Sequence, residues 1–277
     1  QPQRILLPLI GYLIKINLQI INIFVTYCFL NILYKHILKF QSRVITYLLC
    51  ASLSATMVVQ FHYNFGSYPD ILCYFLLLLT FINKERTNAP YIFFFLALLT
   101  KETAIFTALF FLAIKNISKI KIILSCSFYL PIYLYLNTGA YDLSHYLAPL
   151  QSDIMHWFNQ SKPYLLTGYF SSIKFLWVIV ILYIFRDFKN SYPIVFLIIG
   201  ISLQFMLGGD TTRFVSFIFL GLIFVIENLK LDKFLFLNIF ILFLNIITVK
   251  YYVFAYGEMI ILNESRLSFL NFFEIFK

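Results

Sequence analysis

Charged residues are scarce in this chain. They make up 12% of its 277 residues, whereas hydrophobic residues make up 61% and the mean hydropathy is +0.86. Long apolar runs with little charge are typical of a protein that crosses a membrane several times, and they exclude an ordinary water-soluble enzyme. We therefore expect an all-α fold, a polytopic bundle of transmembrane helices surrounded by membrane lipids.

Cysteine is also scarce, and its spacing excludes two common kinds of site. The four cysteines are Cys28, Cys50, Cys73 and Cys126. Each lies inside an apolar run, and no two of them have the CxxC spacing. Neither a disulfide framework nor a zinc site is therefore expected.

The basic residues are placed as topology requires. The formal net charge is +9, and most Lys and Arg residues lie in short loops between apolar runs. Such loops face the cytoplasm in membrane proteins, so the charge indicates orientation and not a nucleic-acid partner. Residues 1–277 are expected to form a single integral membrane domain of about seven spans and one short hairpin. An outer loop at 137–167 and a C-terminal interfacial segment at 256–277 complete it.

Residues 90 to 114 form an apolar run with Lys101 and Glu102 at its middle. One straight helix over this run would put both charges near the bilayer centre, at about 2.5–3.5 kcal/mol each. Basic residues lie just before the run, at Lys84 and Arg86, and again just after it. Both ends of the run are therefore expected on the cytoplasmic side, which predicts a re-entrant or broken helical hairpin with its tip at residues 100 to 103.

The arms of this hairpin are short. Arms of about ten and twelve residues reach roughly 15 to 18 Å, well below a hydrocarbon core of about 30 Å. Broken backbone at that depth is tolerated where it packs in protein or lines a wet cavity. The sequence thus predicts a polar cavity that faces outward.

A single ordinary helix over 90 to 114 is the alternative, and it would place the later basic loops outside. With the hairpin, one side instead collects twelve basic residues: Lys35, Lys39, Arg43, Lys84, Arg86, Lys115, Lys119, Lys121, Arg186, Lys189, Lys230 and Lys233. The positive-inside rule therefore favours the hairpin.

The opposite, outward side collects the unusual polar residues of the chain. They are Arg4, His62, Tyr63, Asp70, Lys101, Glu102, Asp142, His145, Asp153, His156, Asp210 and Arg213. This distribution indicates chemistry or recognition on the outer side. Asp70 follows Pro69 and could instead only cap the helix that it opens, since carboxylates favour helix N-termini.

Two further pairs allow a structural and a functional interpretation. Lys101 and Glu102 could form a structural pair or extend toward water, but neighbouring residues point to different faces of a helix and so favour two separate targets. Asp210 and Arg213, in GGDTTRF, could be a helix cap and a loop charge. Three residues apart, they can also share one helix face, where Arg213 would suit an anion.

The outer loop invites a metal interpretation. Asp153 and His156 are three residues apart, and His145 lies nearby. These residues do not form a defined ligand pattern, so no metal site is assigned. A divalent cation remains open as a cofactor.

One stretch of the chain resembles a known superfamily. An outer loop is followed by YPDILCYFLLLLTFINKER and then by an apolar run that ends in LLTKETAIF. Over residues 60 to 125 this order resembles the middle of GT-C superfamily membrane glycosyltransferases, including bacterial mannosyltransferase-like and aminoarabinose-transferase-like proteins. GGDTTRFVSFIF adds a weaker similarity to multi-pass proteins often grouped with them.

The resemblance implies a function and a location. The donor would be a polyprenyl-phosphate-linked sugar, and an inverting transfer would deliver the sugar to a glycan, lipid or protein acceptor on the outer face of a bacterial plasma membrane. By resemblance, Asp70 matches an acid at the start of an early transmembrane helix and Lys101 matches the lysine of a hairpin. Asp70 is therefore the expected catalytic residue.

The substrate-binding candidates follow from the chemistry of sugar transfer, which needs cations to stabilise the developing phosphate charge, and from the polar residues of the outward side. Lys101 and Arg213 would hold the donor phosphate, and the remaining candidates are Glu102, Asp210, Arg4, His62 and Tyr63. The principal acid of the family lies in a first outer loop after a first helix, and no such segment precedes QPQRILLPLIGYL. Either the chain is an N-terminally truncated copy or it is a different kind of protein.

Two other classes remain open. A multi-pass transporter or flippase would also place charges in a midplane cavity reached by broken helices. The sequence shows no internal repeat and no second interrupted helix in a matching position. A glycan polymerase or ligase, or a non-catalytic subunit of a glycan assembly system, would tolerate the missing acid.

Overall fold

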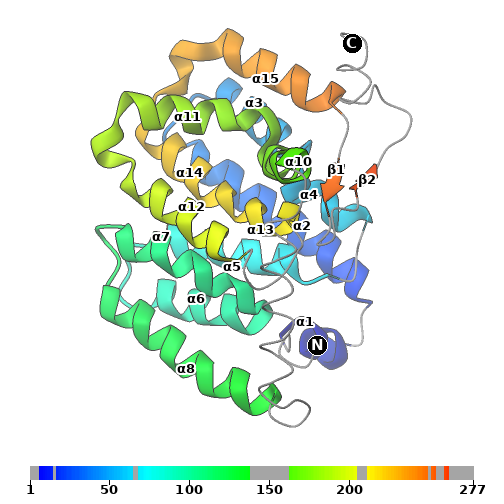
Figure 1. The fold of residues 1–277 in the computed structure, drawn as a ribbon, viewed down its shortest axis with the longest axis vertical. Coiled ribbons are helices and arrows are strands. Elements are labelled where there is room, and N and C mark those ends of the chain that lie inside the picture. Colours follow the sequence, from blue (N-terminus) through cyan, green and yellow to red (C-terminus); the bar gives the residue numbers. More distant parts are fainter. Residues whose placement is uncertain are drawn as a thin grey trace.

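A computed structural model describes residues 6–14, 17–64, 68–137, 162–204, 211–248, 251–253 and 259–261. These residues are almost entirely helical (Figure 1). The exception is a two-stranded antiparallel pair, β1 (Tyr251–Val253) with β2 (Met259–Ile261). The all-α fold class is confirmed. Most of the outer loop 137–167 and of the segment 256–277 lies outside the described residues.

The helices are short, and several are broken by 3-10 turns. In chain order they are α1 (Leu6–Ile14), α2 (Leu18–Ile37), α3 (Arg43–Ser54), α4 (Met57–Asn64), α5 (Asp70–Ile82), α6 (Ala89–Thr100), η1 (Glu102–Thr107), α7 (Ala108–Ala113), α8 (Lys119–Asn137), α10 (Lys162–Ile173), η2 (Lys174–Leu176), α11 (Trp177–Arg186), η3 (Phe188–Asn190), α12 (Tyr192–Gln204), α13 (Thr211–Val215), η4 (Ser216–Ile218), α14 (Phe219–Asn228), η5 (Leu231–Phe234) and α15 (Leu235–Ile247).

Loops that are far apart in the sequence meet at one end of the bundle. Gln41, in the loop after α2, donates to the backbone oxygens of Ile226 and Leu229 at 2.7 Å each. The backbone N–H of Ser42 donates to Asp232 Oδ1 at 3.1 Å. The α2–α3 loop and the α14–α15 loop therefore lie side by side.

Two more loops join this end. Lys121 Nζ donates to the Thr87 carbonyl oxygen at 2.8 Å and to Asn88 Oδ1 at 3.0 Å. The start of α8 thus lies beside the α5–α6 loop. A cavity of about 300 Å³ lies between these loops and η3, and Lys84, Lys115, Asp187 and Glu227 are among its lining residues.

The twelve basic residues that the sequence analysis groups together all lie in these loops or in the helix turns next to them. We call this region the basic end. Five inter-helix connections of the chain meet there, since residues 38–42, 83–88, 114–118, 187–191 and 229–230 lie at the same end. The structure therefore places the basic residues on one side of the bundle, as the sequence predicts.

The apolar run at 90 to 114 is a broken helical hairpin. Helix α6 leads away from the basic end, and the backbone becomes extended at Lys101, with φ −154° and ψ 119°. The chain then returns through η1 and α7 to Lys115, which lines the cavity at the basic end. The two arms pack together, since the rings of Phe94 and Phe111 are 5.5 Å apart. The predicted hairpin is thus present in the fold.

A second broken helix joins α10, η2 and α11. Lys174 has a positive φ of 48°, a left-handed conformation that interrupts a helix. Its buried ammonium donates to the Asn245 and Thr248 carbonyl oxygens at 2.9 Å each. These carbonyls lie at the end of α15, where the helix itself supplies no donors. The sequence analysis did not identify this second interrupted helix.

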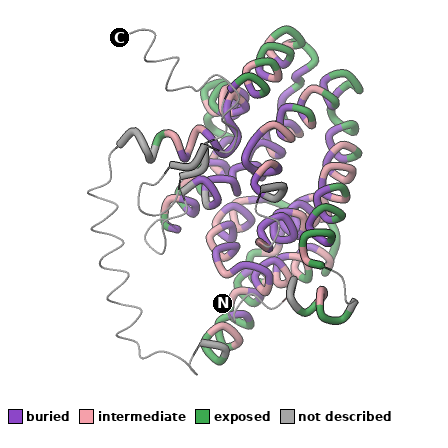
Figure 2. The backbone as a smooth tube through the Cα atoms, turned by 90° about the vertical axis from the view of Figure 1, so that its right-hand side faces the viewer, coloured by how far each residue is buried: buried purple, intermediate pink, exposed green. Residues whose placement is uncertain are grey.

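Apolar side chains cover much of the outer surface as well as the core. Helices turn their buried faces toward one another and their exposed faces outward (Figure 2). Among the exposed residues, Phe24 is 65%, Phe185 is 83% and Phe236 is 86% accessible. Within the described residues, two helical segments, Leu18–Ile37 and Leu166–Arg186, are long and apolar enough to cross a membrane.

Gly200 provides a test of the packing between α12 and the hairpin. A Cβ atom at this position would lie 2.2 Å from the Phe106 carbonyl oxygen, which is backbone and cannot move aside. We expect Gly200→Ala to lower the free energy of unfolding by about 1–3 kcal/mol, as overpacking does. Thermal unfolding of the purified protein in detergent measures the change.

Gly221→Ala is the matched control for this prediction. Its added Cβ would first meet a movable side-chain atom, Leu197 Cδ2, at 3.3 Å. This variant should unfold close to the wild-type temperature. Equal losses in the two variants would contradict the close backbone approach at Gly200.

Candidate functional site

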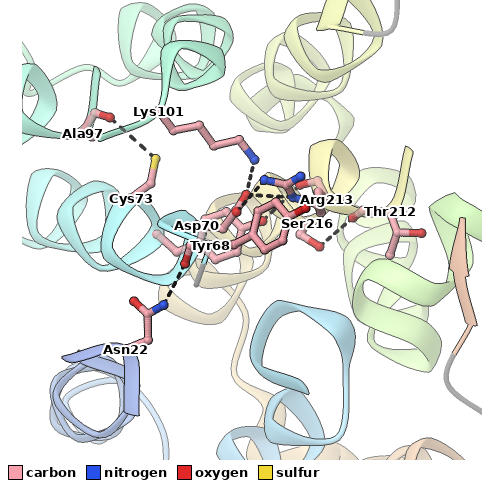
Figure 3. A network of polar contacts seen from close by, with 10 residues as sticks. Asn22, Tyr68, Asp70, Cys73, Ala97, Lys101, Thr212, Arg213 and Ser216 are labelled. Carbon is pink, nitrogen blue, oxygen red and sulfur yellow. Dashed lines mark hydrogen bonds and ion pairs between the residues drawn. The ribbon is translucent and has the colours of Figure 1, made fainter. Parts of the chain in front are cut away.

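Three residues singled out in the sequence meet around one carboxylate. Lys101 Nζ donates to Asp70 Oδ1, and Arg213 donates from Nη2 to Oδ2 at 2.7 Å and from Nε to Oδ1 at 3.3 Å. Asp70 opens α5, Lys101 lies at the turn of the hairpin, and Arg213 lies in α13 (Figure 3). Residues 31 and 143 positions from Asp70 thus form one charged cluster.

The cluster is deeply buried. Asp70 and Lys101 are 0% exposed and Arg213 is 5% exposed. Removing a charge from water costs several kcal/mol, so such residues persist where good geometry and hydrogen bonds compensate. The carboxylate of Asp70 binds two cations, so it does more than place a negative charge at the start of α5. Lys101 likewise does not extend toward water.

Aromatic rings form the walls around the two cations. Arg213 Cζ lies 4.4 Å from the ring centre of Tyr68 and 5.3 Å from that of Phe61, and Lys101 Nζ lies 5.6 Å from that of Phe217. These distances allow cation–π attraction, which strengthens when water is excluded. The cations are therefore held by rings as well as by Asp70.

Neighbouring elements fix the backbone of the site. Asn22 of α2 donates to the Tyr68 carbonyl oxygen at 2.8 Å, just before α5 begins (Figure 3). Tyr74, one turn after Asp70, donates from its hydroxyl to the Arg213 carbonyl oxygen at 3.0 Å. These bonds join α2, α5 and α13, so the positions of Asp70 and Arg213 are fixed relative to each other.

All three charges lie far from the basic end. At about 1.5 Å per residue, the 13 residues of α5 place Asp70 roughly 20 Å from it, and the 12 residues of α6 place Lys101 roughly 18 Å from it. Each residue also lies where a helix starts or breaks. Such points expose backbone polar groups inside the bundle, so the site combines side-chain charges with irregular backbone.

A second carboxylate with two basic partners lies at the basic end itself. Glu227, in the last turn of α14, contacts His36 Nε2 at 2.8 Å and forms an ion pair with Lys84. Lys84 is 19% exposed in its side chain, so this cluster is less enclosed than the first. Nothing in the sequence analysis predicted it. Its residues connect the ends of α2, α5 and α14.

The other predicted site residues have different positions. Glu102 is the first residue of η1 and is partly exposed. His62 and Tyr63 lie in the last turn of α4, directly after Phe61, but their side chains lie outside the described residues. Arg4 and Asp210 also lie outside them, as do the outer-loop residues Asp142, His145, Asp153 and His156.

Sequence reasoning missed the aromatic residues of the site. Tyr68 stands two residues before Asp70 in the YPD triplet, and that closeness is the one signal that could have found it. Phe61, Tyr74 and Phe217 lie in runs rich in Phe and Tyr. Nothing in the sequence of those runs distinguishes a ring that packs against a cation from a ring that faces lipid.

The described residues do not suit a divalent cation. They contain no group of three His, Cys, Asp or Glu side chains close enough to hold a metal ion. Both oxygens of Asp70 face cationic groups, which would repel a metal. We therefore assign no step to a divalent cation at this cluster.

The cluster makes a prediction about stability. Asp70→Asn leaves two cations beside a neutral amide in an enclosed site, and breaking a buried pair costs about 3–5 kcal/mol. We expect a matching loss in the free energy of unfolding, measured by chemical denaturation in detergent. Glu85→Gln, the same change at an exposed position, should stay within about 0.5 kcal/mol of wild type. Similar stability of the two variants would contradict the ion pairs.

No protein-family model, curated protein or solved structure matches this chain. The similarity to GT-C glycosyltransferases therefore rests on the residues quoted from 60 to 125. The features that bear on function are the Asp70–Lys101–Arg213 cluster and the fold that positions it.

Proposed function

We propose that this protein is a multi-pass membrane glycosyltransferase of a bacterial plasma membrane. It would move a sugar from a polyprenyl-phosphate donor to a glycan, lipid or protein acceptor on the extracytoplasmic face, with inversion at the anomeric carbon. The observation that carries the proposal is the contact of Asp70 with both Lys101 and Arg213 at the broken end of a helical hairpin. This cluster combines a carboxylate with two cations, as such a transfer requires.

A position in the membrane accounts for the outer surface. Phe24, Phe185 and Phe236 are exposed on separate helices, and lipid is the solvent that such faces suit. The basic end would face the cytoplasm, as the positive-inside rule states. The short helices would then span the bilayer as a polytopic bundle, and α6, η1 and α7 would form a re-entrant hairpin.

This orientation places the site toward the outer surface. Asp70 and Lys101 lie roughly 18 to 20 Å from the basic end, and the hydrocarbon core is about 30 Å thick. The cluster would thus lie past the middle of the bilayer. A lipid phosphate from the outer leaflet would reach it by a short path.

Lys101 and Arg213 suit the donor phosphate. Arginine binds phosphate oxygens with two parallel N–H groups, and lysine adds a point charge. Both cations contact Asp70. An arriving phosphate would bind the same N–H groups and replace the carboxylate, so donor binding and the opening of the ion pairs would be one event.

The released carboxylate would then act as the base. An acceptor hydroxyl oxygen forms a bond to the anomeric carbon while the bond from that carbon to the phosphate oxygen breaks. The hydroxyl proton passes to Asp70, and the polyprenyl phosphate leaves with its added charge stabilised by Lys101 and Arg213. Attack from the side opposite the phosphate inverts the anomeric carbon. Glu102, directly after Lys101 at the turn of the hairpin, is the carboxylate nearest to Lys101 in the sequence.

A transporter or flippase is the second candidate, and the break at Lys174 favours it. Transporters use broken helices with charges near the midplane. Among the described residues, helices are broken at Lys101 and at Lys174. Movement of a substrate without any covalent product distinguishes this function from sugar transfer.

The test measures both sugar transfer and lipid transport, in the wild-type protein and in one variant. Lys101→Met keeps the stem length of the side chain and leaves Asp70 bound to Arg213, so the fold should persist. We expect sugar transfer from undecaprenyl phosphomannose or undecaprenyl phosphoglucose, in proteoliposomes, to fall at least about a hundredfold, the scale for losing a charge-stabilising group.

Lys121→Met is the matched control, because Lys121 lies at the basic end and binds Thr87 and Asn88. It should keep wild-type transfer. Equal activity of both variants would overturn the role of Lys101. Lipid movement across the vesicle membrane with no glycosylated product would replace the proposal by the transporter.

A further inference from the structure

Two buried polar side chains near the hairpin turn have no hydrogen-bond partner among the described residues. Gln204 is 0% exposed, and in the part of the chain that the structure describes neither its Nε2 nor its Oε1 has a hydrogen-bond partner. Thr103, two residues after Lys101, is 7% exposed, and its Oγ1 is unpaired in the same way. Each unpaired buried group costs about 1–3 kcal/mol, so groups of this kind call for water or a ligand.

The two residues lie at the same level of the bundle. Helix α12 leaves the basic end at Tyr192, whereas η1 and α7 run back toward it, so the two segments are antiparallel. They touch where Gly200 meets the Phe106 carbonyl oxygen. Four residues beyond Gly200, a rise of about 6 Å, α12 reaches Gln204. The same rise along a 3-10 helix covers about three residues and leads from Phe106 to Thr103.

The side chain of Gln204 also lies on the face of α12 that is turned toward the hairpin. Residues four positions apart lie on one face of an α-helix. Gly200 faces η1, so Gln204 lies on the face of α12 that is turned toward the hairpin. Helix α12 further contacts α13, the helix that carries Arg213. Gln204 therefore lies between the hairpin turn and the helix of the second phosphate-binding cation.

The chemistry of these groups indicates a ligand rich in hydroxyls. An amide offers donors on nitrogen and an acceptor oxygen, and a threonine hydroxyl can donate or accept. Adjacent hydroxyls of a sugar ring present the same combination. An anion would meet the amide N–H but leave the amide oxygen unpaired, and an apolar group would satisfy neither atom. A sugar bound next to the two cations would form hydrogen bonds with the amide of Gln204 and the hydroxyl of Thr103.

We propose that Gln204 and Thr103 bind hydroxyls of the donor sugar, while Lys101 and Arg213 hold its phosphate. This inference rests on the proposed function and adds the residues that distinguish a sugar-bearing lipid from the bare lipid phosphate. Gln204 is then a specificity residue. The carboxamide would remain unpaired until the sugar enters.

The test measures binding of two lipids to purified protein in detergent. The probes are undecaprenyl phosphate and undecaprenyl phosphate carrying a mannosyl or glucosyl group, and the variants are Gln204→Met and Lys101→Met. Gln204→Met should weaken binding of a sugar-bearing lipid about tenfold, the value of one or two hydrogen bonds, and leave bare undecaprenyl phosphate unchanged. Lys101→Met should weaken both. The unfolding temperature of ligand-free Gln204→Met should equal or exceed that of wild type, because the unpaired amide is gone.

Each other outcome has a distinct meaning. If Gln204→Met keeps the wild-type preference for the sugar-bearing lipid, or if wild type shows no preference, the sugar site is overturned and the phosphate site stands. A lower unfolding temperature together with equal loss of both lipids would show that Gln204 is structural, for instance through a buried water, and would also overturn it. If wild type binds neither lipid, the proposed function fails, and the sugar site fails with it.

Discussion

The contact of Asp70 with Lys101 and Arg213 is the constraint on which the rest of the bundle depends. Three charges that are 0% to 5% exposed are compatible with folding when they meet one another. That meeting requires α5 to begin, α6 to end and α13 to begin at the same depth. The short helices and the break at Lys101 follow from this requirement, since a continuous helix would carry Lys101 into an apolar layer without its partner.

Both candidate functions use the same property of this site. A cation pair that is held by a carboxylate is placed in advance for another anion, because little rearrangement is needed at Lys101 and Arg213. The rings of Tyr68 and Phe217 keep the cations in position and exclude water. The cluster therefore presents two cations that one carboxylate holds in fixed positions.

The helical class, the hairpin and part of the site were predictable from the sequence, whereas the described residues contain two helical segments long and apolar enough to cross a membrane, fewer than the seven expected spans. Lys101 at the centre of an apolar run, with basic residues at both ends, predicted a hairpin, and the loops at the basic end confirm its direction. Asp70, Lys101 and Arg213 were found because charge is rare in this composition and therefore conspicuous. Their mutual contact was not predictable, since Asp70 and Arg213 are 143 positions apart.

Other features gave no usable signal. Gln204 is a neutral residue at the end of an apolar helix, and its burial depends on how α12 packs against η1. The left-handed backbone at Lys174 depends on the carbonyls at the end of α15, 71 and 74 positions away. Tertiary packing therefore determines the burial of Gln204 and the backbone conformation of Lys174, and the local sequence does not.

The two charged clusters lie at opposite ends of α5, and α2 is tied to each end of it. Asn22 and Tyr68 tie α2 to the start of α5 near Asp70, and His36, Lys84 and Glu227 tie α2, α5 and α14 together at the other end. Helices fastened at both ends act as one stiff body. Tilting α2 against α5 would break the hydrogen bond of Asn22 at one end or the ion pair of Glu227 with Lys84 at the other, so the depth of Asp70 in the bundle is fixed from both ends.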